Sequence, residues 1–226
     1  MQARRLTGSL VYVAIFALAM AYLEAAVVVY LRRIYGITDL IRDVAAYDPS
    51  LAAIEAGREA ATLAMLLALG LAAGRSAQAR LGFALFAFGF WDILYYAWLR
   101  ILIGWPRTLM DPDLLFLIPL PWWGPVLSPV LIAVLAIAAG WMAVARDDRG
   151  LRFNPGPVGW AALAAGILAA LYAFMADALQ ALPASPETLG RLRPGDFPWP
   201  AYSAAILLMT FALWRAARFT PRHPAR

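Results

Sequence analysis

Six long apolar stretches alternate with shorter polar or proline-rich connections along the chain. They cover about residues 9–31, 50–74, 81–104, 125–145, 157–180 and 201–218. An α-helix of ~20 residues crosses a hydrocarbon core of ~30 Å, and all six stretches come close to this length. The pattern predicts an all-α, polytopic membrane protein, in which a bundle of six transmembrane helices forms a single integral membrane domain over residues 1–226.

The beginnings of the first two stretches indicate what kind of segment each one is. The first follows a pair of arginines and contains the pattern Ala-Met-Ala at 19–21, which is also typical of a cleaved signal peptide. Apolar sequence continues through Leu31, so we favour a membrane span. The second stretch follows Asp48 and a proline, which predicts a helix that begins outside the membrane with Asp48 or Ser50 as its N-cap.

The connection between the third and fourth stretches, residues 105–125, is too apolar for a solvated loop and too rich in proline for a spanning helix. Its apolar run 114–118 needs burial. We predict that this connection lies at the outer interface or re-enters the bundle, with the sequence Asp-Pro-Asp at 111–113 capping a short helical turn. It would act as a lid over a site in the bundle or as an interfacial anchor.

Arginine supplies all of the positive side-chain charge at neutral pH. The chain has 19 arginines, no lysine and a formal net charge of +5. Eleven arginines flank one end of the predicted spans and six flank the other. Because positive loops mark the cytoplasmic side, we predict a multi-pass protein of the cell (inner) membrane with both termini in the cytoplasm. The charges lie between apolar stretches rather than on one soluble face, so we expect no nucleic-acid partner.

The residue types exclude several kinds of chemistry. Cysteine is absent, and the only histidine is His223 in the polar C-terminal tail. The chain therefore cannot form a disulfide, a thiolate metal site or a haem site with a pair of buried histidines. Neither a G-x-G-x-x-G sequence nor a P-loop sequence is present. We accordingly predict no cofactor and no dedicated metal site.

Acidic residues inside the apolar stretches are the strongest functional signal. A charge at the centre of a bilayer costs roughly 2.5–3.5 kcal/mol, so such residues are rare and often functional. Counting ~1.5 Å of rise per residue from the inner end puts Glu24 and Glu59 at ~22 Å and Asp92 at ~18 Å. Arg100 and Asp177 come out at ~30 Å, near the outer interface. We expect the first three carboxyl groups to converge, on the order of 4–10 Å apart.

Helical spacing adds neighbours to these carboxylates. One face of the second stretch carries Glu55, Arg58, Glu59 and Thr62, and one face of the third carries Asp92, Tyr95 and Tyr96. The two tyrosines could donate hydrogen bonds to Asp92, and Arg58 or Arg100 could hold Glu59 in a fixed ion pair. The alternative to a functional role is a structural tie between helices or, for Asp177, plain solvation. The candidate site residues are Glu24, Glu59, Asp92, Arg58, Arg100, Tyr95, Tyr96 and Asp177.

A site of carboxylates and arginines that opens outward is compatible with three functions. We favour a small-solute or proton-coupled transporter, or a membrane solute-binding subunit, which would bind a small solute or a cation. Ala17, Ala21 and Ala25 form a small-residue face on the first stretch with which such a subunit could dock a membrane-protein partner. The first alternative is an assembly or scaffold subunit of a membrane complex, in which the polar groups serve as ties between helices. The second is an intramembrane enzyme that modifies lipids with these carboxylates, with or without Mg²⁺ or Mn²⁺. Membrane lipids are expected partners in each case.

Overall fold

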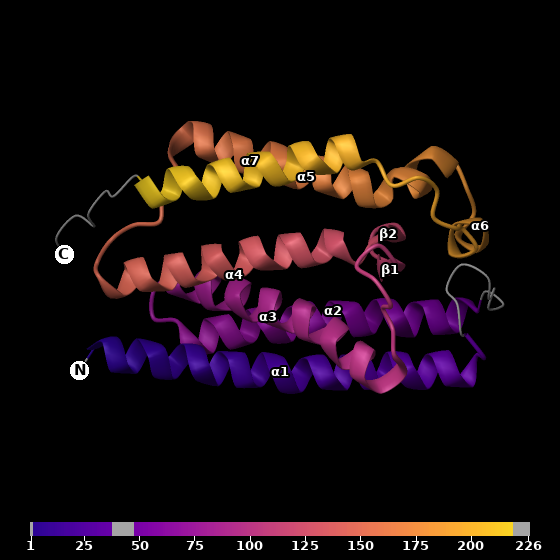
Figure 1. Cartoon of the computed structure of the whole chain (residues 1–226), viewed down its shortest axis with the longest axis horizontal. Helices are drawn as coiled ribbons and strands as arrows, with labels where there is room; N and C mark the ends of the chain where they lie inside the picture. Colours follow the sequence, from indigo (N-terminus) through magenta and orange to yellow (C-terminus); the bar gives the residue numbers. More distant parts are fainter. Residues whose placement is uncertain (1, 38–47, 219–226) are drawn as a thin grey trace.

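Long helices run side by side along the molecule, and a short β-hairpin lies between them near one end (Figure 1). This computed structural model describes residues 2–37 and 48–218, with side chains from residue 8 onward. The helices are α1 (Gln2–Ile34), α2 (Pro49–Ala73), α3 (Ala77–Ile103), α4 (Leu127–Asp148), α5 (Gly156–Ala181), α6 (Pro186–Gly190) and α7 (Trp199–Arg218). Within the described residues, six helices (all but α6) are long and apolar enough to cross a membrane. The predicted six-span bundle is confirmed, and apart from the start of α1 each predicted boundary lies within a few residues of the observed one.

Side-chain caps fix where the helices of the first half begin. The Asp48 carboxylate accepts the backbone N–H groups of Ser50 at 2.8 Å and Leu51 at 3.4 Å, which confirms the predicted N-cap of α2. Ser76 caps α3 in the same way by accepting the N–H of Ala79 at 3.0 Å. At the other end of α3, Gly104 adopts a left-handed conformation with φ of 71°, which a residue without a Cβ adopts at little cost. The turn after Gly104 leads into the hairpin.

Helix α3 is the centre of one half of the bundle. It packs against α1, α2 and α4, while α5 and α7 pair with each other and α7 also contacts α4. Ala17, Ala21 and Ala25 of α1 are 0% exposed because α1 packs against α3 along this face. The prediction that this small-residue face docks a separate protein is therefore wrong. Small residues serve here to bring two helices of the same chain close together.

The connection at 105–125 forms a β-hairpin. Strand β1 (Pro112–Phe116) pairs antiparallel with β2 (Trp122–Pro125), and Asp113 lies opposite Gly124. The predicted helical turn at 111–113 is wrong, because two extended strands can pair their backbone groups with each other where prolines prevent a helix. Asp111 instead closes the preceding turn, accepting the Arg107 N–H and the Thr108 hydroxyl at 2.7 Å each. The hairpin lies within the bundle and contacts α4 and α5, as the predicted re-entrant geometry requires.

Helix α1 begins and α7 ends at the same end of the bundle, opposite the hairpin (Figure 1). The excess of arginine at that end predicts that it faces the cytoplasm. We expect a reporter that is active only in the cytoplasm to be active when fused after residue 226 and inactive when inserted in the 32–48 connection. Paired fusions with a reporter that is active only outside the membrane provide the control, and the opposite pattern would reverse the orientation.

Candidate functional site

A cavity of about 280 Å³ lies beside the hairpin, between α1, α2 and α3 on one side and α4 and α5 on the other. The three carboxylates expected to converge all line it, and Arg58, Tyr95 and Tyr96 line it as well. Its charged side chains are Glu24, Arg32, Glu55, Arg58, Glu59, Asp92 and Asp113. The cavity is thus rich in acids, with five carboxyl groups and two guanidinium groups among the described lining residues.

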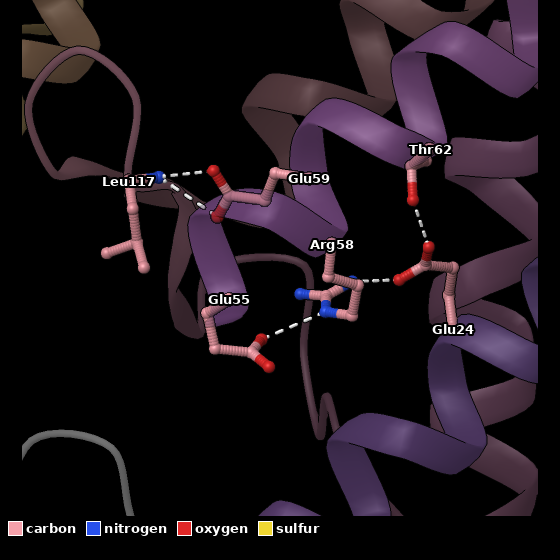
Figure 2. Close-up of polar contacts among 6 residues, drawn as sticks. All are labelled: Glu24, Glu55, Arg58, Glu59, Thr62 and Leu117. Carbon is pink, nitrogen blue, oxygen red and sulfur yellow. Dashed lines mark hydrogen bonds and ion pairs between the residues drawn. The ribbon is translucent and has the colours of Figure 1, made fainter. Parts of the chain in front are cut away.

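Arg58 joins the acids of α1 and α2 (Figure 2). Its Nη1 atom donates to Oε2 of Glu24, and its Nε atom donates to Oε2 of Glu55 at 2.9 Å. The second oxygen of Glu24 accepts the hydroxyl of Thr62, one turn along the same face of α2. Both oxygens of Glu24 are therefore satisfied, which a buried carboxylate requires. This group ties the middle of α1 to α2.

Glu59 points away from Arg58 and toward the hairpin (Figure 2). Its two carboxylate oxygens accept the backbone N–H of Leu117 at 3.0 and 2.9 Å. The ion pair that Glu59 could have formed with Arg58 or Arg100 is not what the structure shows, because Arg58 is taken by Glu24 and Glu55. Glu59 is 7% exposed and connects α2 to the loop that follows β1. Its contact makes the position of the hairpin depend on a carboxylate inside the bundle.

Asp113 is the acid that the hairpin itself brings into the cavity. Tyr96 donates its hydroxyl to Oδ2 of Asp113 at 3.0 Å, and Nη2 of Arg32 lies 3.9 Å from Oδ1. The Arg32 guanidinium also lies over the Trp105 ring, 4.1 Å from its centroid. The prediction that Tyr96 serves Asp92 is wrong, because the re-entrant strand offers it another carboxylate. These contacts link the hairpin to α1 and α3.

Arg32 and Asp113 were absent from the candidate site residues, although the sequence contains a signal for each. Arg32 follows Glu24 by eight residues, so it lies two turns along the same face of a helix. Asp113 directly precedes an apolar run that must be buried, and a carboxyl group in a buried segment needs a partner. By position alone, however, both residues fall at the ends of the connections between spans, where charged side chains are commonly solvated.

Asp92 differs from the other acids of the cavity. It is 8% exposed, and its Oδ2 atom has no hydrogen-bond partner among the described residues. Neither of the tyrosine hydrogen bonds expected for it appears in the part of the chain that the structure describes. The structure therefore places a largely buried carboxyl group with an unsatisfied oxygen on the cavity wall.

Arg100 and Asp177 do not belong to this lining. Arg100 donates from Nη1 to the carbonyl oxygens of Gly104 at 2.6 Å and Pro106 at 3.1 Å, so it closes the turn after α3. Asp177 accepts the backbone N–H of Gly195 at 3.0 Å and holds the segment before α7. Both residues lie at the depth expected for them near the helix ends, but they stabilise loops instead of facing the cavity.

A buried acid that titrates near neutral pH gives the hairpin a measurable signature. Burial raises the pKa of the Asp113 carboxyl from 3.8 to about 6, although Arg32 and the hydrogen bond from Tyr96 act to lower it. Between pH 7 and pH 5 the folded protein therefore takes up a proton at Asp113 that the unfolded chain does not. We expect this group to add about 1 kcal/mol of stability as the pH falls through this range.

Asp113→Asn should remove that contribution, because the amide does not titrate and keeps an oxygen that accepts the Tyr96 hydroxyl. The measurement is thermal unfolding at a series of pH values between 5 and 7, for the wild type and the variant. Parallel pH curves for the two proteins would contradict the assignment.

The fold and the cavity define a class: a multi-pass membrane bundle with an acid-rich cavity and a hairpin as one of its walls. No protein-family model, curated protein or solved structure matches the chain. Within the described residues, no group of three or more histidine or acidic side chains is arranged to hold a metal ion. The chemistry available to the cavity comes from its five carboxyl groups, its two arginines with acidic partners, and the aromatic rings among its lining residues.

Proposed function

We propose that this protein binds a small solute in the cavity beside the hairpin and belongs functionally to the membrane transporters or their solute-binding subunits. One observation carries the proposal: a cavity of about 280 Å³ inside a membrane bundle is lined by charged side chains from α1, α2, α3 and the hairpin. Charges inside a membrane are costly, and they commonly mark the path of a solute or an ion. A bundle whose polar residues served only as ties between helices would not need an open volume between them.

The hairpin suits the role of a lid. Its polar and aromatic contacts are separable: Leu117 to Glu59, Asp113 to Tyr96 and Arg32, and the Trp122 ring stacked on Phe174 at 5.8 Å. Each contact can be broken without unfolding a spanning helix. Movement of residues 105–125 would then open the cavity at the end of the bundle opposite the start of α1.

The absence of cysteine makes the proposal directly testable, because a single introduced cysteine is unique in the chain. Val28 lines the cavity, and its neighbour Val27 is 36% exposed on the outer surface of α1. A maleimide reacts with the thiolate, which forms only where water reaches the side chain. We expect Val28→Cys, in the full-length protein in lipid nanodiscs, to react with N-ethylmaleimide about 10-fold or more faster than the matched control Val27→Cys.

A bundle without a water-filled cavity would give equally slow reactions at the two positions. If the cysteine at position 28 reacts as slowly as the one at position 27, the solute site fails and the scaffold function gains support. Protection of the cysteine at position 28 by an added solute, with no effect on the fully unfolded protein, would identify an occupant of the cavity. Mass spectrometry of the intact protein gives the extent of modification in each case.

A further inference from the structure

We infer that the cavity selects a small organic cation, whose positive group would lie between the Asp92 carboxylate and the aromatic wall. This inference names the substrate class of the site and rests on the proposed solute-binding function. It depends on two independent features of the cavity: the distribution of unpaired charge, and the rings that line it.

The first feature is that both arginines of the cavity already have acidic partners. Arg58 contacts Glu24 and Glu55, and Arg32 lies near Asp113. An anionic solute would have to displace a carboxylate from one of them. Both positive charges of the cavity are therefore already paired with carboxylates of the protein.

The carboxylates, in contrast, outnumber the guanidinium groups. Glu59 has a backbone N–H as its partner and no ion pair within the described part of the chain. Asp92, more than nine-tenths buried, leaves Oδ2 without any partner there. A buried carboxylate without an ion pair is unfavourable, so a cation that enters the cavity would supply the charged partner that Asp92 lacks.

The second feature is the aromatic wall. On α3 the rings of Phe88, Trp91 and Tyr95 follow one another, with centroids 5.8 and 6.4 Å apart. On the other side, Trp122 of the hairpin stacks on Phe174 of α5, and all five rings line the cavity. Aromatic faces attract a cation through the negative charge of the ring surface, and groups of rings recognise substituted ammonium ions.

The cavity is poorly suited to a simple metal ion. A metal ion of the Mg²⁺ or Ca²⁺ type needs several oxygen ligands around it, and no such group of side chains exists within the described residues. An ammonium ion that carries apolar substituents instead meets both a carboxylate and ring surfaces. The volume of about 280 Å³ lies just below the ~300–1,000 Å³ of sites for drug-sized ligands, so the cation is small.

Three probes of nearly equal shape test the inference on Val28→Cys and on the wild-type protein. They are choline, its neutral carbon isostere 3,3-dimethylbutan-1-ol, and the anion 3,3-dimethylbutanoate. We expect choline to protect Val28→Cys from N-ethylmaleimide and to raise the unfolding temperature of the wild type at concentrations about 10-fold or more below those needed for the neutral isostere. The anion should have no effect on either measurement.

The variant Asp92→Asn keeps the size of the side chain and removes its charge, so it should weaken the effect of choline about 10-fold or more. Asp177→Asn is the matched control, because Asp177 lies outside the cavity and holds a loop. If Asp92→Asn does not fold, the comparison of the three probes on the wild type still decides the question.

The outcomes separate the two proposals. Tighter binding of the neutral or anionic probe would overturn the cation class and leave the solute site intact. No effect of any probe, with a reactive cysteine at position 28, would also overturn the cation class while the cavity remains open to water. An unreactive cysteine at position 28 would overturn the solute site itself and the inference with it.

Discussion

Replacing Arg58 by alanine is expected to destabilise the folded protein by about 3 kcal/mol. The change leaves Glu24 buried with Thr62 as its remaining side-chain partner and also frees Glu55 on the same helix face. Removal of one partner from a buried ion pair costs about 3–5 kcal/mol, because the other charge remains uncompensated. We take the lower end because the Arg58 side chain is 27% exposed. Thermal unfolding should move down by about 6–12 °C for a chain of this size.

A surface ion pair provides the matched control. Arg191 lies 2.8 Å from Glu187, but both side chains are more than half exposed. Arg191→Ala should lower the free energy of unfolding by less than about 1 kcal/mol, because water stabilises both partners of the pair. Combining Arg58→Ala with Glu24→Gln should recover a large part of the loss, since the orphaned charge is then removed. An equal loss in Arg58→Ala and Arg191→Ala would show that the α1–α2 tie does not depend on burial.

The spans, and the common level of the three acids along their helices, could be predicted because both depend on distances along a single helix. Apolar run length gives each span directly, and a constant rise per residue gives the level of Glu24, Glu59 and Asp92 along their helices. These three acids came from separate helices, yet they line one cavity. The level of a residue along its own helix is therefore the property of the site that the sequence determines most directly.

The direction in which a side chain points around its helix could not be predicted in the same way. Depth and charge are the only properties by which the sequence predicts Arg100 and Asp177 as site residues. Arg100 turns back to the carbonyl groups that follow its own helix, and Asp177 binds a loop. The choice between a cavity and a loop depends on which helices are neighbours, and this order is a tertiary property.

The hairpin is the second feature that could not be predicted from the sequence. An apolar run such as 114–118 is compatible with a helix or with a buried strand, and periodicity does not separate the two over so few residues. The proline content excluded a long helix without predicting which strand partner the run would find. That partner, β2, brings Asp113 to Tyr96 and Leu117 to Glu59. The acids of the helices were predictable, whereas their contacts to the hairpin were not.

Replacing Gly140 by leucine is expected to remove at least about 3 kcal/mol of stability and to leave little monodisperse protein. A Cβ at this position would lie 2.5 Å from the carbonyl oxygen of Gly82 and 2.6 Å from the backbone nitrogen of Phe86, both on α3. These are backbone atoms, so a side-chain rotation cannot relieve the overlap and α3 and α4 must separate. Overpacking costs typically 1–3 kcal/mol when side chains can adjust, and we expect more where they cannot. Size-exclusion chromatography and thermal unfolding give the measurement.

Gly57 of α2 is the matched control, because a Cβ there would meet no atom within 4 Å. Leucine at position 57 should be neutral or slightly stabilising, since it removes the conformational freedom of a glycine within a helix. Gly140→Ala should fall between the two, because it adds the clashing Cβ without a longer side chain. The separation of α3 from α4 would also move Asp92 and Trp91 on α3 away from Pro129 and Ile132 on α4, which line the same cavity. Cysteine at position 28 should then lose its protection by any solute together with the fold, whereas wild-type stability in Gly140→Leu would refute the close packing of these two helices.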